Sequence, residues 1–70
     1  METPVEQAER RVASAKEIIV TQRWIVDRMR TKGRDSKTAE ALLVQFKASL
    51  VVFEADRAEL KRKSWLQLGA

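Results

Sequence analysis

The sequence contains no cysteine and no histidine, and only two glycines and one proline among its 70 residues. Without cysteine the chain can form neither a disulfide nor a thiolate metal site, and without histidine it lacks the commonest metal ligand and general base. Zinc chemistry and catalysis by Ser-His or Cys-His pairs are therefore excluded. The scarcity of glycine and proline is typical of an all-helical protein.

Long hydrophobic runs are also missing. No apolar stretch approaches the roughly 20 residues that a membrane-spanning helix needs. The segment from Met1 to Pro4 lacks the basic and apolar regions of a signal peptide. We therefore expect a cytoplasmic protein with no transmembrane segment, and a chain of this length is expected to form one domain over residues 1–70.

Charge is present in both signs, with 14 basic and 10 acidic residues interleaved along both halves of the chain. Such interleaving is typical of solvated helix surfaces. The carboxylates Glu54, Asp56 and Glu59 lie among basic residues, which favours surface ion pairs over acid-base catalysis. There is no glycine-rich phosphate loop, nucleophile elbow or metal box. We therefore expect a protein that is not an enzyme and binds no cofactor.

A short polar segment, Thr31 to Lys37, separates two long stretches with helical periodicity. Gly33 can adopt the left-handed conformation that ends a helix, and basic residues precede it where they complement the helix dipole. Asp35 or Ser36 can then accept hydrogen bonds from the first N–H groups of a new helix. The segment predicts a bend at residues 33–36 between antiparallel helices.

The first helix is predicted over residues 4–32. Thr3, Pro4 and Glu6 form a capping-box pattern with proline at the first helical position. From there, residues that recur at alternating spacings of three and four form one seam. The seam consists of Val5, Ala8, Val12, Ala15, Ile19, Gln22, Val26 and Met29.

The second helix is predicted over residues 37–63 or slightly beyond, followed by a short tail. We expect Leu43 and Arg57 on the flank of its inward stripe. The stripe itself consists of Leu42, Phe46, Ser49 or Leu50, Phe53 and Leu60. Folding the chain at the bend places Phe53 opposite Ala15 and Leu60 opposite Ala8, so that large side chains face small ones. The predicted fold is an all-α, coiled-coil-like two-helix hairpin.

Gln22 is the polar exception in the first seam. The fold at the bend places it beside Phe46. Its side chain is either a partly exposed amide or the donor of a hydrogen bond that sets the register of the two helices.

The second helix carries another apolar stripe on its opposite side, and the first helix adds apolar residues outside its seam. A hairpin covers only one stripe on each helix, so the second stripe predicts self-association into a homodimeric four-helix bundle. The predicted interface comprises Val20, Trp24, Val44, Ala48, Val51, Val52 and Ala55. Alanines alone would be explained by helix propensity, but the valines and Trp24 would not.

Several stretches between Ile19 and Leu60 resemble a group of small, uncharacterised helical-hairpin proteins common in alphaproteobacteria. The resemblance lies in Ile19-Val-Thr-Gln22, Ile25-Val26, Arg28-Met29, Gly33-Arg-Asp-Ser36, Ala39-Glu40, Leu42-Leu43, Phe46 and Leu50. The chain departs from the group at Trp24, at Arg34, where the group often has histidine, and after Leu60. The resemblance implies a helical hairpin in a bacterial protein, and no catalytic residue comes with it.

Two other partners remain alternatives to self-association. A basic cluster at the bend predicts phosphate contacts in a small nucleic-acid-binding or regulatory protein. This cluster comprises Arg28, Arg30, Lys32, Arg34 and Lys37. The basic and apolar tail from Lys61 to Leu68 predicts contact with an anionic membrane or docking onto another protein subunit.

Overall fold

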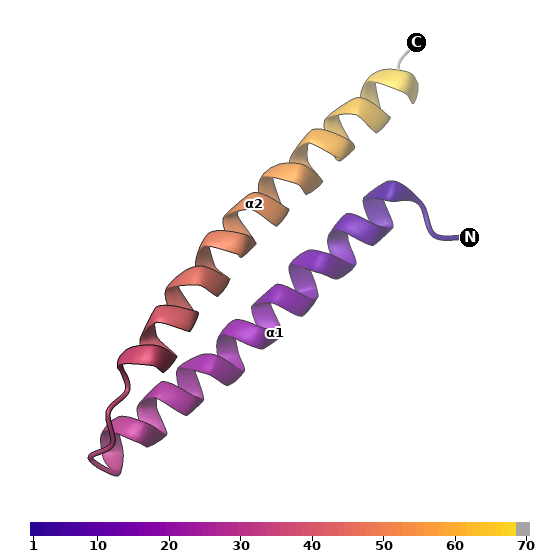
Figure 1. Cartoon of the computed structure of the whole chain (residues 1–70). Coiled ribbons are helices and arrows are strands. Elements are labelled where there is room, and N and C mark those ends of the chain that lie inside the picture. The colour runs from indigo at the N-terminus through magenta and orange to yellow at the C-terminus, as the bar shows by residue number, and fades with distance from the viewer. Residues whose placement is uncertain (69–70) are drawn as a thin grey trace.

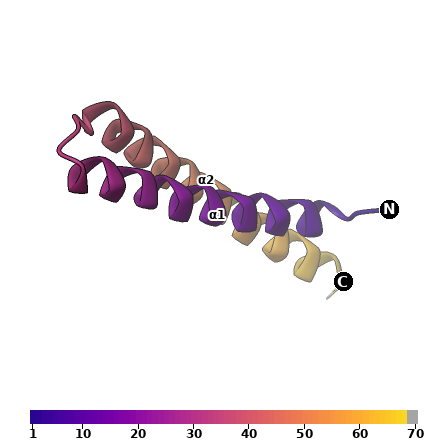
Figure 2. The same ribbon diagram turned by 90° about the horizontal axis from the view of Figure 1, so that it is seen from below.

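A computed structural model describes residues 1–68, and it consists of two helices packed against each other. Helix α1 spans Pro4–Thr31 and helix α2 spans Lys37–Leu68. The helices run antiparallel, with the bend at one end and both termini at the other (Figure 1). They cross gradually along their length, as the turned view shows (Figure 2). The predicted all-α hairpin is confirmed, as a rod of 59 × 20 × 13 Å.

The N-terminus of α1 is fixed by a reciprocal pair of hydrogen bonds. The Glu6 N–H donates to the Thr3 hydroxyl oxygen at 3.1 Å, and the Thr3 N–H donates to the Glu6 carboxylate at 3.3 Å. Pro4 occupies the first helical position, where a missing N–H costs nothing. The predicted capping box is confirmed, and it satisfies two backbone donors that the first turn would otherwise leave open.

The C-terminus of α1 closes through Gly33, whose φ of 68° lies in the left-handed region. The Arg34 N–H donates to the Met29 carbonyl at 2.8 Å, and the Gly33 N–H donates to the Arg30 carbonyl at 3.1 Å. This pair of bonds is the Schellman arrangement that follows from a left-handed residue just after the helix. The predicted role of Gly33 as the helix-ending residue is confirmed.

Helix α2 begins directly after the bend. The Lys37 N–H donates to the Asp35 carboxylate at 3.0 Å, and the Ser36 carbonyl accepts the first helical hydrogen bond from the Glu40 N–H at 2.8 Å. Only residues 32–36 therefore lie between the helices. Helix α2 continues to Leu68, so the predicted tail after residue 63 is helical.

The core is a single seam between the helices, and α1 supplies most of its buried side chains. The predicted α1 row is confirmed, because its six central members are buried. They are Ala8, Val12, Ala15, Ile19, Gln22 and Val26. Among the α2 side chains through Gln67, only Ala39 is buried, while larger side chains that face the seam remain half-buried. These are Leu43, Phe46, Leu50, Phe53, Arg57 and Leu60.

One α2 assignment from the sequence is wrong. Leu43 is half-buried against α1, whereas Leu42, predicted to face inward, is 40% exposed. Seven-residue steps back from Leu50 and Phe46 reach Leu43 and Ala39, so the observed seam keeps the heptad spacing to the first turn of α2. Within residues 1–68, neither helix has an apolar segment of membrane-spanning length.

We expect Gly33→Ala to destabilise the protein by roughly 1 kcal/mol, because an L-residue with a Cβ is strained at positive φ. No atom lies within 4 Å of the place that this Cβ would occupy, so the effect isolates backbone strain from packing. Urea or thermal melts measure the loss. Gly33→Asn is the control and should lose less, since asparagine tolerates this conformation. Equal stability of Gly33→Ala and the wild type would contradict the assignment.

Candidate interaction surfaces

Helix α2 carries an exposed row of small and apolar side chains along the side that α1 does not cover. We call it the outer row, and it comprises Ala41, Val44, Ala48, Val51, Ala55, Ala58 and Trp65. Its members repeat at spacings of three and four, with Arg62 at the one step that is not apolar. Val44 and Val51 are each 66% exposed and Trp65 is 75% exposed.

Helix geometry explains why the outer row is left open. Successive residues of a helix are about 100° apart around its axis. Leu50 lies in the seam. Val51 is one residue after Leu50, and Ala48 is two residues before Leu50. Both therefore turn well away from α1. Helix α2 thus has two heptad rows, one packed against α1 and the other in solvent.

The predicted interface residues do not form one continuous surface. Val44, Ala48, Val51 and Ala55 belong to the outer row, and Val52 lies at its margin. All seven residues of the predicted set are exposed. The remaining two, however, are on the other helix.

Val20 and Trp24 lie on α1, apart from the outer row. Trp24 is two residues from both Gln22 and Val26, which are buried in the seam, so it points away from α2. The Arg28 guanidinium lies 4.7 Å from the centre of its ring, a cation–π contact that occupies one face of the indole. Trp24 therefore has a neighbour within its own helix and does not extend the outer row.

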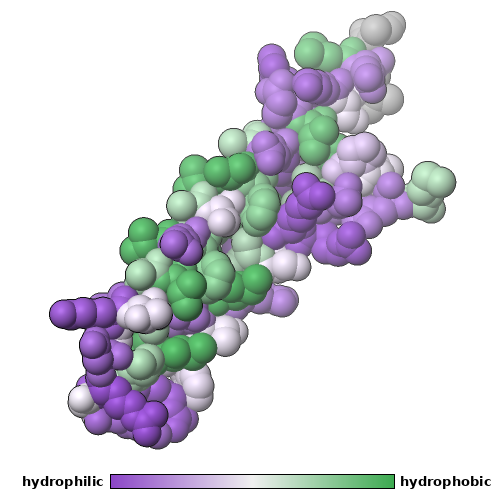
Figure 3. All heavy atoms as spheres, viewed as in Figure 1, coloured by the Kyte–Doolittle hydropathy of each residue, from purple (hydrophilic) through white to green (hydrophobic). Residues whose placement is uncertain are grey.

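A second apolar area lies in the groove between the helices, and sequence reasoning did not find it. Ile18 is 47% exposed at its edge, and the half-buried Phe46 and Phe53 line its floor. The hollow measures about 280 Å³. In Figure 3, apolar side chains gather along the middle of the visible face, and polar ones gather at the bend end. The sequence feature that could have indicated this groove is the position of Ile18, Ile25 and Leu42, each of which directly precedes a seam residue.

Charged residues form an edge between the seam and the outer row. The Lys61 amine lies 3.0 Å from the Glu9 carboxylate, and Arg30 forms an ion pair with Glu40, so both bridges join α2 to α1. Between them, Lys47 and Glu54 form no ion pair within residues 1–68. Lys47 lines one hollow with basic and acidic residues alike, namely Arg23, Asp27, Arg30 and Glu40.

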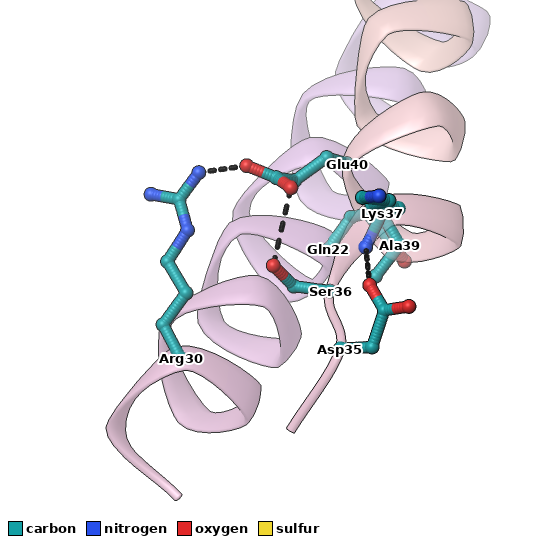
Figure 4. Close-up of polar contacts among 7 residues, drawn as sticks. All are labelled: Gln22, Arg30, Asp35, Ser36, Lys37, Ala39 and Glu40. Carbon is teal, nitrogen blue, oxygen red and sulfur yellow. Dashed lines mark hydrogen bonds and ion pairs between the residues drawn. The ribbon is translucent and has the colours of Figure 1, made fainter. Parts of the chain in front are cut away.

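Gln22 and the start of α2 are tied together at the bend (Figure 4). The Gln22 amide nitrogen donates to the Ala39 carbonyl at 2.9 Å, and its side chain is buried. The Ser36 hydroxyl donates to the Glu40 carboxylate at 3.1 Å. Glu40 also accepts from Arg30. The predicted hydrogen bond from Gln22 to the other helix is confirmed, and the alternative of a partly exposed amide is wrong.

The predicted basic cluster at the bend divides into two groups. Arg28 packs over Trp24, and Arg30 is paired with Glu40. Lys32, Arg34 and Lys37 are exposed around the bend. These last three form no ion pair or cation–π contact within residues 1–68.

The carboxylates of α2 are spread around the helix. A hydrogen bond from Arg62 and the charge of its guanidinium, with a smaller contribution from Lys63, lower the pKa of Glu59. Glu59 is therefore held as an anion in a surface ion pair, which leaves it poorly suited to donate protons near neutral pH.

No family model matches the chain, and comparisons with curated proteins and with solved structures return no match. The resemblance to helical-hairpin proteins of alphaproteobacteria therefore remains a prediction.

We expect Gln22→Glu to destabilise the hairpin by about 2 kcal/mol at neutral pH, because it buries a carboxylate against the Ala39 carbonyl. Burial raises the pKa of the new carboxyl, and its protonated form can donate to that carbonyl. The defect should therefore shrink as the pH falls from 7 toward 4 and grow as it rises. Urea melts at several pH values test this.

Gln22→Leu is the matched control, since it removes the donor without introducing charge, and Ala39 can keep its helical hydrogen bond. It should stay within about 1 kcal/mol of the wild type at every pH. If Gln22→Glu were as stable as Gln22→Leu at neutral pH, the side chain would not be buried as described.

Proposed function

We propose that this protein is a non-catalytic, self-associating interaction module in which a second copy covers the outer row of α2. Two hairpins then form a four-helix assembly. The observation that supports this proposal is the exposure of a complete heptad row on a helix whose other heptad row already packs against α1. A helix that is apolar on two sides is normally covered on both.

The distribution of burial supports a missing partner. Six side chains of α1 are buried, whereas α2 contributes Ala39 alone among its side chains through Gln67. Val44 and Val51 are each about two-thirds exposed, and covering what remains exposed of each is worth roughly 1 to 2 kcal/mol. A partner on the outer row would therefore add apolar burial where the hairpin has least.

The chemistry of the row favours another helix as the partner. Alanines recur in it at heptad spacing, and small side chains allow two helix axes to approach closely while valines fill the remaining volume. A second copy provides a surface of the same length and spacing. Symmetric homodimers are also the commonest soluble oligomers.

Nucleic-acid binding is the second candidate, supported by the exposure of Lys32, Arg34 and Lys37 around the bend. These residues together with the net charge of +4 would attract phosphates. The cluster is small, and neither helix displays a groove-reading motif. Self-association remains the function that the surfaces favour.

We expect light scattering at micromolar concentration to report about twice the chain mass, and the melting temperature to rise with protein concentration. The mass doubles because two chains associate. The melting temperature rises because binding of a second folded copy stabilises the folded state by mass action. A folded monomer with a melting temperature independent of concentration would remove the proposal.

Val51→Glu should break the assembly and lower the melting temperature, since it places a carboxylate in the middle of the outer row. Thr21→Glu is the matched control, because it puts the same charge on an exposed mid-helix position of α1 outside the row. Scattering and melting curves of the two variants are compared. Equal mass for Val51→Glu and the wild type would exclude the outer row as the interface.

For nucleic acid, we expect a gel shift of DNA or RNA at very low salt only, as generic attraction to a basic protein, and none at about 150 mM salt. Binding that persists at that salt would favour the second candidate instead. In that case Lys32→Ala combined with Arg34→Ala should flatten the salt dependence, since fewer counterions are released.

A further inference from the structure

We propose that the second copy packs antiparallel, α2 against α2, in one register that is selected by the charged edge of the outer row. This inference rests on the proposed self-association and adds its orientation and alignment. The two-fold axis passes near Ser49 and Leu50, in the middle of α2.

In this register the apolar layers match in size. Ala48 lies opposite the partner's Val51, and Val44 lies opposite the partner's Ala55. Ala41 lies opposite the partner's Ala58. Each valine therefore faces an alanine, as close helix packing requires. The apolar layers end where Arg62 meets the partner's Lys37.

The charged edge alternates in sign along α2. Glu40, Lys47, Glu54 and Lys61 recur every seven residues and flank the outer row on the side nearer α1. Residues at this flanking position meet one another across an antiparallel helix pair. The proposed register brings Lys47 to the partner's Glu54 and Glu40 to the partner's Lys61. By symmetry, all four contacts along this edge join opposite charges.

Other arrangements lose this match. A slip of one heptad in one direction brings Lys47 beside the partner's Lys47, and a slip in the other direction brings Glu54 beside the partner's Glu54. A parallel pair joins Glu54 to the partner's Glu59 and creates no opposite-charge contact on this edge. Like charges at such positions are destabilising, so the edge favours the proposed register over these neighbours.

Within one hairpin, the two central residues of this edge form no ion pair. Glu40 and Lys61 are bridged to α1, but Lys47 and Glu54 have no ion-pair partner within residues 1–68. Lys47 lines a hollow with Arg23, Asp27, Arg30 and Glu40, but it forms no ion pair with either carboxylate. The second copy supplies an ion-pair partner for each of these two residues.

Charge reversal tests the register in the full chain. Lys47→Glu leaves two acids at the centre of the edge, and Glu54→Lys leaves two bases. Each variant alone should self-associate about tenfold more weakly than the wild type in low-salt buffer, because two attractive contacts become repulsive. An equimolar mixture should form the heterodimer in preference to either homodimer, and the variant carrying both substitutions should regain the wild-type affinity.

Native mass spectrometry and analytical ultracentrifugation report these populations. Statistical mixing of the two variants, or single variants that self-associate with the wild-type affinity, would overturn the register. The proposed function would still stand as long as the wild type is dimeric. A monomeric wild type would remove both. Circular dichroism shows whether each single variant is folded. If a single variant is unfolded, recovery of helical structure in the equimolar mixture supports the register.

A second test uses the absence of cysteine, which makes any introduced thiol unique. Ala41→Cys and Ala58→Cys chains, mixed and oxidised, should give a disulfide-linked heterodimer. Ala41→Cys alone should not crosslink to itself, because its two copies would lie about 26 Å apart along the axis, at 1.5 Å per residue. Crosslinking of Ala41→Cys to itself would indicate a parallel pair and overturn the proposal.

Discussion

A pair of helices meets along a single line, and this constraint shapes the whole molecule. Each helix can bury one heptad row against its neighbour, and any further apolar row must stay in water or meet something else. Helix α1 buries one row in the seam, and its exposed apolar side chains, such as Val20 and Trp24, form no second continuous row. Helix α2 differs, because its large half-buried side chains face α1 while the alanines and valines of the outer row face away.

Local chemistry allowed much of the hairpin to be predicted from the sequence. Thr3 and Glu6 define a helix start by side-chain hydrogen bonds to nearby backbone, and Gly33 defines a helix end by its conformational freedom. The α1 row follows from periodicity, since apolar residues recur along it at spacings of three and four, with Gln22 as the one polar member. Each of these features depends on residues only a few positions apart.

Features that depend on the other helix were less predictable. Leu42 and Leu43 are equally apolar neighbours, and the choice between them depends on how α2 rolls against α1. The acceptor for Gln22 is a backbone carbonyl, which leaves no mark in the sequence. The groove, and the separation of Trp24 from the outer row, likewise follow from helix placement. Periodicity identifies which residues share a face, but it does not say which faces adjoin.

Both chain ends leave the hairpin at the end opposite the bend (Figure 1). In an antiparallel pair of such rods, the ends of the two copies would point in opposite directions. Anything joined to one copy would then be held roughly a rod length from its counterpart on the other. The hairpin would thus act as a molecular ruler, whose span is set by the number of helical turns between its bend and its termini.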